Sequence, residues 1–310
     1  MTLGAERNDD NLSIHHFSGD YIMHALRFFL PAMLLCSVPA LAVEVAPGDY
    51  SQFPDGTTVG LLYYQHASTG SAYSRGDKVS SDYNLTSDIG MLRLLHTVQI
   101  SESATLDPQF LLPFGRVSGG GDASGLGSAS GTGDLILTVP LKVKLNSGGD
   151  IFGFAPYLYV PSGNYDHNDA LNLGENRWKV DLQAAWVKYF TEKWALDVVG
   201  DAIWYGENND YGTASSRLQQ DNAWAAQIMG RYMPDPTLAL GLGFGQSWGG
   251  ETTVDGVKQD NQTQTTNVRI TATQFVTPRD QFQIQLGRDL RVENGAEENF
   301  RLNLRYARVF

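Results

Sequence analysis

Apolar and polar residues alternate with a period of two along most of this chain. The closing stretch, residues 298–310, shows the pattern clearly, because Phe300, Leu302, Leu304 and Tyr306 are separated by arginine and asparagine. Strict alternation over this length predicts a β-strand with one apolar face and one polar face. The same pattern predicts twelve strands, at residues 57–67, 87–100, 105–117, 133–145, 151–161, 176–190, 193–206, 220–233, 237–249, 265–276, 281–292 and 298–310.

The gaps between these stretches alternate in length. After even-numbered stretches they are tight, at residues 101–104, 146–150, 191–192, 234–236 and 277–280. After most odd-numbered stretches they are long and rich in glycine, serine, aspartate and asparagine, at residues 68–86, 118–132, 162–175, 207–219 and 250–264, while the gap at 293–297 is short. An up-and-down barrel in an outer membrane has short periplasmic turns and long outer loops. A β-sandwich has no reason to sort its loops in this way.

Aromatic residues are spaced as a membrane-spanning strand requires. Trp194 and Trp204 lie ten residues apart on the apolar face of one predicted strand, as do Phe300 and Phe310 on the last strand. Ten residues in a strand tilted by about 40° rise roughly 25 Å, the height of the apolar band of an outer-membrane barrel, and aromatic rings gather at its two borders. We therefore predict an all-β fold, an up-and-down antiparallel transmembrane β-barrel of about 12 strands. It occupies residues 57–310 and lies in the cell outer membrane of a Gram-negative bacterium.

The N-terminal region has the features of an export signal. Residues 23–42 have a short basic start, an apolar centre and small residues at the end, which are typical of a cleaved secretory signal peptide. Since signals begin at the initiator, residues 1–22 are predicted to be an upstream extension, and residues 43–56 a periplasmic N-terminal segment. Cys36, the single cysteine, lies inside the signal, so the mature chain offers neither a disulfide nor a thiolate metal site.

Two stretches resemble a known family. Residues 130–145 (SGTGDLILTVPLKVKL) and 158–190 (LYVPSGNYDHNDALNLGENRWKVDLQAAWVKYF) are similar to segments of the outer-membrane transporters named for the MetA-pathway of phenol degradation, and the similarity extends to the glycine-rich strand at 241–248. The resemblance implies an outer-membrane barrel linked to uptake of aromatic or other hydrophobic compounds.

The end of the chain resembles the assembly signal of bacterial outer-membrane barrels. Tyr306 and the terminal Phe310 carry this resemblance, while Arg308 stands where such signals usually have an apolar residue. The resemblance implies recognition by the barrel-assembly machinery. It also explains why the chain finishes on a strand, because in lipid the last strand must close on the first.

Two functions are consistent with these features. The first is an outer-membrane channel or transporter for a small solute, hydrophobic or aromatic in character. The alternative is a structural or adhesive barrel that acts through its extracellular loops. Twelve strands enclose more space than a packed eight-stranded barrel and less than an open porin. The lumen is therefore expected to be a narrow pore, or one partly plugged by residues 43–56 or by an inward loop. The oligomeric state stays open.

Charged residues on the predicted polar faces are the candidates for the lumen: Arg93, Asp197, Asp201, Arg231, Arg269, Arg301 and Arg305. They could simply fill or wet the interior. As a permeation path, the arginines of the late strands would face Asp197 and Asp201 across a transverse field. Arg177 and Trp178, which follow the long loop at 162–175, are candidates for a constriction at the lumen mouth.

No catalytic, metal or cofactor site is predicted. His66 and His167 fall on the outer side without a recognisable serine or aspartate partner pattern, and His96 falls at the opposite end. The GLGFGQ stretch at 241–246 lies within a strand rather than before a helix, so it is not a dinucleotide fingerprint. The acidic loop at 166–169 is more simply a solvated loop than a calcium site. A formal net charge of −12 argues against nucleic acid as a partner.

Overall fold

The computed structural model describes residue 1 and residues 45–310. Apart from residue 1, the predicted upstream extension (1–22) and signal peptide (23–42) lie outside these residues. In this described part of the chain, no helix is long and apolar enough to cross a membrane.

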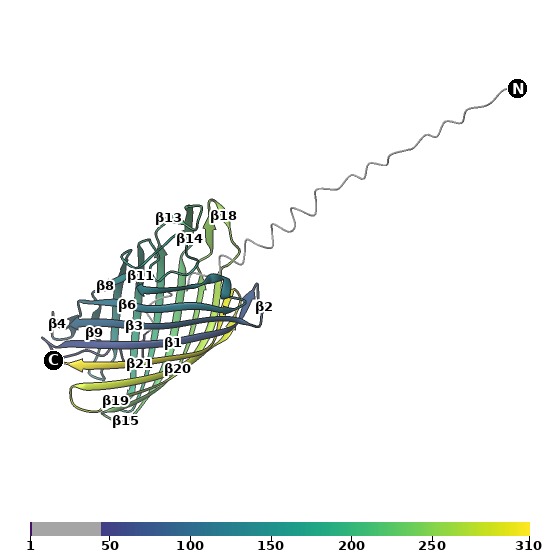
Figure 1. Cartoon of the computed structure of the whole chain (residues 1–310). Helices are drawn as coiled ribbons and strands as arrows, with labels where there is room; N and C mark the ends of the chain where they lie inside the picture. The colour runs from purple at the N-terminus through teal and green to yellow at the C-terminus, as the bar shows by residue number, and fades with distance from the viewer. Residues whose placement is uncertain (2–44) are drawn as a thin grey trace.

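Twelve antiparallel strands close into one barrel within residues 45–310 (Figure 1). The strands are β1 (Thr58–Ser74), β3 (Tyr83–His96), β6 (Gln109–Gly121), β8 (Leu135–Thr138) continued by β9 (Leu141–Lys144), β10 (Ile151–Val160), β11 (Lys179–Thr191), β12 (Trp194–Tyr205), β15 (Ala223–Asp235), β16 (Leu238–Gly249), β19 (Thr263–Phe275), β20 (Asp280–Val292) and β21 (Gly295–Val309). Each pairs with its neighbour in chain order, and β21 pairs with β1 from Val309 opposite Val59 to Gly295 opposite Tyr73. The predicted fold class and the predicted closure of the last strand on the first are confirmed.

One strand of the wall is interrupted. Val139 and Pro140 separate β8 from β9, and both halves pair with β10. Proline has no backbone N–H to give to a strand ladder, so the break falls where such a donor is missing. The carbonyl of Pro140 still accepts a hydrogen bond from the backbone N–H of Asp107 at 2.9 Å.

Alternation sorts the side chains into an outer apolar surface and an inner polar one. In β12, Trp194 and Trp204 are exposed, while Asp197 and Asp201 are buried. Exposed leucine, isoleucine, phenylalanine and tryptophan side chains continue around the barrel. A large exposed apolar surface of this kind is stable in lipid rather than in water.

The long outer gaps contain more β-structure than the alternation predicts. β1 continues into a hairpin with β2 (Asp77–Ser80), β7 (Ser128–Thr132) pairs with β6, and β13 (Asn208–Tyr211), β14 (Ser216–Gln220), β17 (Thr252–Val254) and β18 (Val257–Lys258) form a small separate sheet. β4 (Val98–Gln99) and β5 (Ala104–Leu106) form a short hairpin at the other end, and a 3-10 turn covers Ser124–Leu126. In Figure 1 the C-terminus lies at the end of the barrel that carries β4 and β9, and β2 lies at the opposite end.

Candidate functional site

The end of the lumen near the short turns is filled by the chain's own N-terminal residues. Residues 45–53, here called the N-terminal plug, lie inside the barrel before the chain enters β1, and none of them is part of a strand. The backbone N–H of Asp49 donates to the carbonyl of Ala46 at 3.1 Å, which folds the segment into a turn. Val45, Ala46 and Tyr50 are buried. Side chains, rather than sheet hydrogen bonds, therefore hold the plug.

Two charged residues of the wall contact the plug directly. Arg305 Nη1 donates to Asp49 Oδ1 at 2.6 Å, and the backbone N–H of Gly48 donates to Asp197 Oδ2 at 2.8 Å. Burial raises the pKa of the Asp49 carboxyl, but the guanidinium groups of Arg305 and Arg93 outweigh this and lower that pKa below its usual value. Asp49 is therefore an ionised carboxylate at neutral pH.

A buried lysine binds the backbone of the plug. Lys142 Nζ donates to the carbonyls of Asp49 and Ser51, both at 2.9 Å, and lies 2.9 Å from Asp107 Oδ2. In the other direction, Gln52 Nε2 of the plug donates to the carbonyl of Lys142 at 2.8 Å. The wall therefore holds the plug both by its backbone carbonyls and by its side chains.

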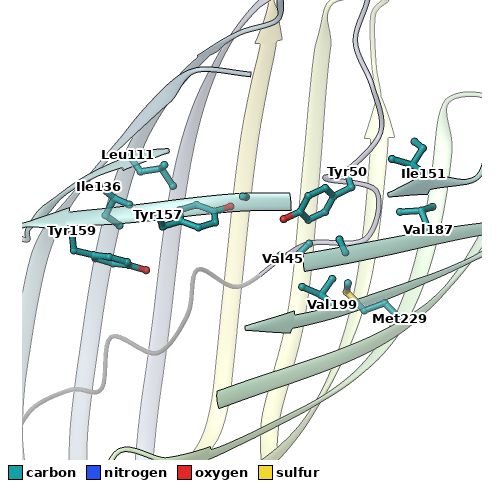
Figure 2. Packing of buried hydrophobic residues seen from close by; sticks show 12 residues of the cluster. Val45, Tyr50, Leu111, Ile136, Ile151, Tyr157, Tyr159, Val187, Val199 and Met229 are labelled. Carbon is teal, nitrogen blue, oxygen red and sulfur yellow. The ribbon is translucent and has the colours of Figure 1, made fainter. Parts of the chain in front are cut away.

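The ring of Tyr50 fits against the wall in the space that a glycine leaves free. It lies against Gly153, where a Cβ atom would come within 2.1 Å of Tyr50 Cδ1, so only glycine leaves room for it. The Tyr50 hydroxyl donates to Gln183 Oε1 at 2.6 Å, and Gln183 Nε2 donates to Asp201 Oδ1 at 2.6 Å. Asp201 thereby orients the amide that accepts from Tyr50. Figure 2 shows Tyr50 directed towards Tyr157 among the buried apolar residues of the lumen.

The plug leaves little free space around itself. One cavity is lined by residues that include Pro47, Arg269 and Gly243, and another by residues that include Asp49, Tyr50 and Arg93. Each has a volume of about 10 Å³, room for about one water molecule. These spaces are too small for an organic solute.

All seven predicted lumen residues lie on the inward side of their strands. Their partners differ from the expected transverse field. Asp197 forms an ion pair of 2.9 Å with Arg231 on the neighbouring strand, and Arg301 pairs with Glu298. The structure therefore brings Asp197, Asp201, Arg231, Arg93 and Arg305 together around the plug. Arg269 and Arg301 lie apart from its polar contacts, although Arg269 lines one of the two cavities.

A second charged cluster lies where the long loop at 161–178 enters β11. The Glu175 carboxylate forms ion pairs with Arg177 Nη2 at 2.7 Å and with Lys179 Nζ at 2.5 Å. The Arg177 guanidinium also lies 4.7 Å from the centroid of the Tyr205 ring. Burial raises the pKa of Glu175, but Lys179 and Arg177 overcome it and lower that pKa to about 2. Trp178, the neighbour of Arg177, is 53% exposed, and its place in a constriction at the mouth stays a prediction.

Both outer histidines have partners that the sequence pattern did not reveal. His66 Nδ1 lies 2.8 Å from Asp88 Oδ1, and His167 Nδ1 lies 3.0 Å from Asp210 and 3.1 Å from Ser215 Oγ. A catalytic triad needs its carboxylate and its hydroxyl on different ring nitrogens. In His167 both partners face Nδ1, so the arrangement lacks that geometry. Among residues 45–310, no group of three or more histidine, cysteine or acidic residues is placed to hold a metal.

The residues of the predicted assembly signal lie on the outer surface of β21. Tyr306 Oη donates to Asp280 Oδ1 at 2.7 Å, and the Tyr306 ring packs on Phe282 with centroids 5.1 Å apart. The backbone N–H of Phe310 donates to the carbonyl of Thr58 at 2.9 Å, while 69% of the residue is exposed. The terminal ring is thus presented at the seam, and its role in assembly stays a prediction.

Comparison with known proteins decides the family. Residues 69–306 match the family described as "Putative MetA-pathway of phenol degradation". The chain belongs to this family. An outer membrane channel from Pseudomonas putida F1 is 61% identical in sequence with a TM-score of 0.86, and the match covers 86% of this chain and 100% of that one. No curated protein matches the chain.

The barrel also shares its fold with a more distant protein. The beta domain of the Bordetella autotransporter BrkA is 7% identical with a TM-score of 0.55, over 83% of this chain and 100% of that one. This likeness concerns the fold alone. Family membership and the closed barrel place this chain in the outer membrane.

Several residues that shape the lumen are not among the residues predicted from the sequence. Lys142 and Gln183 lie at inward positions of alternating strands, so the rule that selected Asp197 could have found them. Asp49 and Tyr50 precede the first strand and belong to no periodic pattern. Only their position in the folded chain shows that they belong to the site.

Proposed function

We propose that the barrel conducts a small hydrophobic or aromatic solute, and that the N-terminal plug closes this route until it withdraws towards the periplasm. One observation carries the proposal. Residues 45–53 fill the lumen without taking part in the strand pairing of the wall. The plug can therefore leave while every strand keeps its partners.

The contacts of the plug suit a reversible closure. They are a limited set of hydrogen bonds. The charge-assisted ones are Arg305 to Asp49, Lys142 to the carbonyls of Asp49 and Ser51, and the Gly48 N–H to Asp197. A hydrogen bond to a charged group contributes about 1.5–3 kcal/mol, and a neutral one about 0.5–1.5 kcal/mol. Release of the plug costs a sum of such terms, and water or solute that enters the lumen satisfies the exposed polar groups in turn.

The wall around the plug has the chemistry of a site for small aromatic molecules. Tyr157 and Tyr159 are buried, Tyr63 and Tyr189 are partly buried, and polar side chains lie between them. Pockets for small ligands combine aromatic lining with a few placed polar groups. This mixture favours a solute with one ring and one polar group over a long alkyl chain.

Planar-bilayer conductance tests the proposal. We would compare the refolded mature chain, residues 43–310, with a chain that begins at residue 54 and so lacks the plug. A chain that lacks the exposed tip at 255–260 serves as a matched truncation outside the barrel. Migration before and after boiling verifies that each protein is a folded barrel.

We expect brief openings from the mature chain, sustained openings from the chain without the plug, and mature-chain behaviour from the control. Silence from the folded chain without the plug would contradict a conducting route. Equal conduction with and without residues 43–53 would contradict the plug as the closing element.

A further inference from the structure

The charges of the lumen wall divide into those that the wall neutralises itself and those that it does not. Lys142 lies 2.9 Å from Asp107, and Arg231 lies 2.9 Å from Asp197, and all four residues belong to the barrel. These pairs stay neutral whether the plug is present or absent.

Arg93 and Arg305 are different. Within residues 45–310, Asp49 of the plug is the carboxylate in contact with Arg305, and no carboxylate lies within ion-pair distance of Arg93. The other partners of these two side chains are neutral, since Arg305 Nη2 donates to Gln281 at 3.0 Å and Arg93 Nε donates to Gln109 at 2.5 Å. Withdrawal of the plug leaves these two guanidinium groups without a carboxylate in direct contact, although Asp201 of the wall stays in the same part of the lumen.

Those two guanidinium groups lie in a sheltered place. The Arg305 side chain is only 7% exposed, and its Nε–H is buried without a partner in the described chain. A buried charge without a partner is costly, so the empty site attracts an anion. A guanidinium group matches a carboxylate in shape as well as charge.

The space that the Tyr50 ring occupies lies next to Arg93, one of the two arginines of the anion site. Asp49, Tyr50, Arg93 and Gln183 line the same small cavity. The plug therefore brings a carboxylate and a phenol ring into one part of the lumen, with Gly153 beneath the ring and Gln183 at its hydroxyl.

We propose that Arg93 and Arg305, together with the ring site over Gly153, bind a small aromatic carboxylate when the plug is displaced, and that Asp49 and Tyr50 occupy this site as an internal competitor. The inference rests on the proposed function, since it assigns a solute class to the route that the plug closes. Solute and plug exclude each other, so bound solute holds the plug out.

Isothermal titration calorimetry with benzoate tests the site without any need for transport. The protein is the mature chain, folded in detergent, with the double substitution Asp49→Asn and Tyr50→Ala, which removes both competing groups. We expect benzoate to bind this variant at least about tenfold more tightly than it binds the wild type, because a charge-assisted contact no longer competes. The substitution Asp55→Asn makes the same charge change on an exposed turn outside the lumen and should leave the wild-type affinity.

A third substitution, Arg305→Gln, should weaken benzoate binding to the double variant by about tenfold or more. Where that protein does not fold, probes on the double variant decide instead: benzyl alcohol lacks the charge and acetate lacks the ring, so both should bind at least about tenfold more weakly than benzoate. Equal binding of benzoate and benzyl alcohol would overturn the carboxylate site, and equal binding of benzoate and acetate would overturn the ring site.

The titration separates this inference from the proposed function. Benzoate binding by a barrel that never conducts would keep the site and reject the route. Conduction without benzoate binding to the double variant would keep the route and reject the site.

Discussion

A methyl group at residue 153 should open the channel without any change to the plug itself. Gly153 lies in β10, and a Cβ there would come within 2.1 Å of Tyr50 Cδ1 and 2.2 Å of Tyr50 Cε1. No side-chain contact survives at that separation, so Gly153→Ala forces the ring to move. The backbone of Gly153 does not have a positive φ, so alanine can adopt it without strain.

Two responses bound the size of the effect. Expulsion of the ring loses its burial, about 1.5–3 kcal/mol, and its hydrogen bond to Gln183, about 0.5–1.5 kcal/mol. A smaller shift of ring and strand carries the usual cost of overpacking, about 1–3 kcal/mol. The molecule takes the cheaper response, so we expect the plugged state to lose about 1–3 kcal/mol, a change of about 5-fold to 150-fold in the ratio of open to closed channels.

Single-channel recording in a planar bilayer measures this ratio as the fraction of time open. Gly230→Ala is the matched control, because a Cβ at Gly230 meets no atom within 4 Å and the residue faces outward on β15. An open fraction for Gly153→Ala equal to that of the wild type and of Gly230→Ala, in proteins that all show heat-shifted migration, would refute the reasoning.

Two further predictions concern the mouth and the seam. The folded-state pKa of Glu175, about 2, lies below its unfolded value, so its contribution of about 3 kcal/mol is present above pH 4.5 and is lost as the pH falls towards 2. Thermal unfolding of the wild type should show a loss of stability as the pH falls, and Glu175→Gln should show a smaller loss. Glu251→Gln, which removes a comparably sheltered carboxylate, is the control and should behave as the wild type. An equal loss of stability in all three proteins would contradict the prediction. Phe310→Ala should lower the amount of folded barrel in the outer membrane several-fold, whereas Phe300→Ala, which removes the same ring at the other border, should lower it little; equal loss in membrane fractions would argue against a terminal signal.

The barrel wall could be predicted because lipid imposes one rule on every spanning strand. Trp194 and Trp204 must face apolar surroundings and Asp197 must not, so a period of two fixes both the strand and its orientation. The outer hairpins could not be predicted in this way. β13 and β14 belong to a small sheet separate from the barrel wall, so lipid imposes no alternation of side chains on them.

The lumen was predictable in its composition but not in its pairing. Alternation selected Asp197 and Arg305 as inward residues, yet their partners depend on contacts between segments far apart in the sequence. The Asp49–Arg305 pair joins residues 256 positions apart, and the Gly153 contact depends on the shape of a ring rather than on a charge. A local pattern carries no information on either contact.

The Asp49–Arg305 contact also constrains the order in which the molecule is assembled. Arg305 lies on the last strand, which pairs with β1, the strand that directly follows the plug. Contacts between distant residues form late, since the chain loses the entropy of the closed loop before it gains the contact. The Asp49–Arg305 contact needs β21 in its place beside β1, so this anchor of the plug is complete only in the closed barrel. A barrel whose last strand has not joined lacks this one anchor, while the plug contacts of Lys142, Gln183 and Asp197 do not depend on that strand. The tightness of the plug thus reports whether the ring of strands is finished.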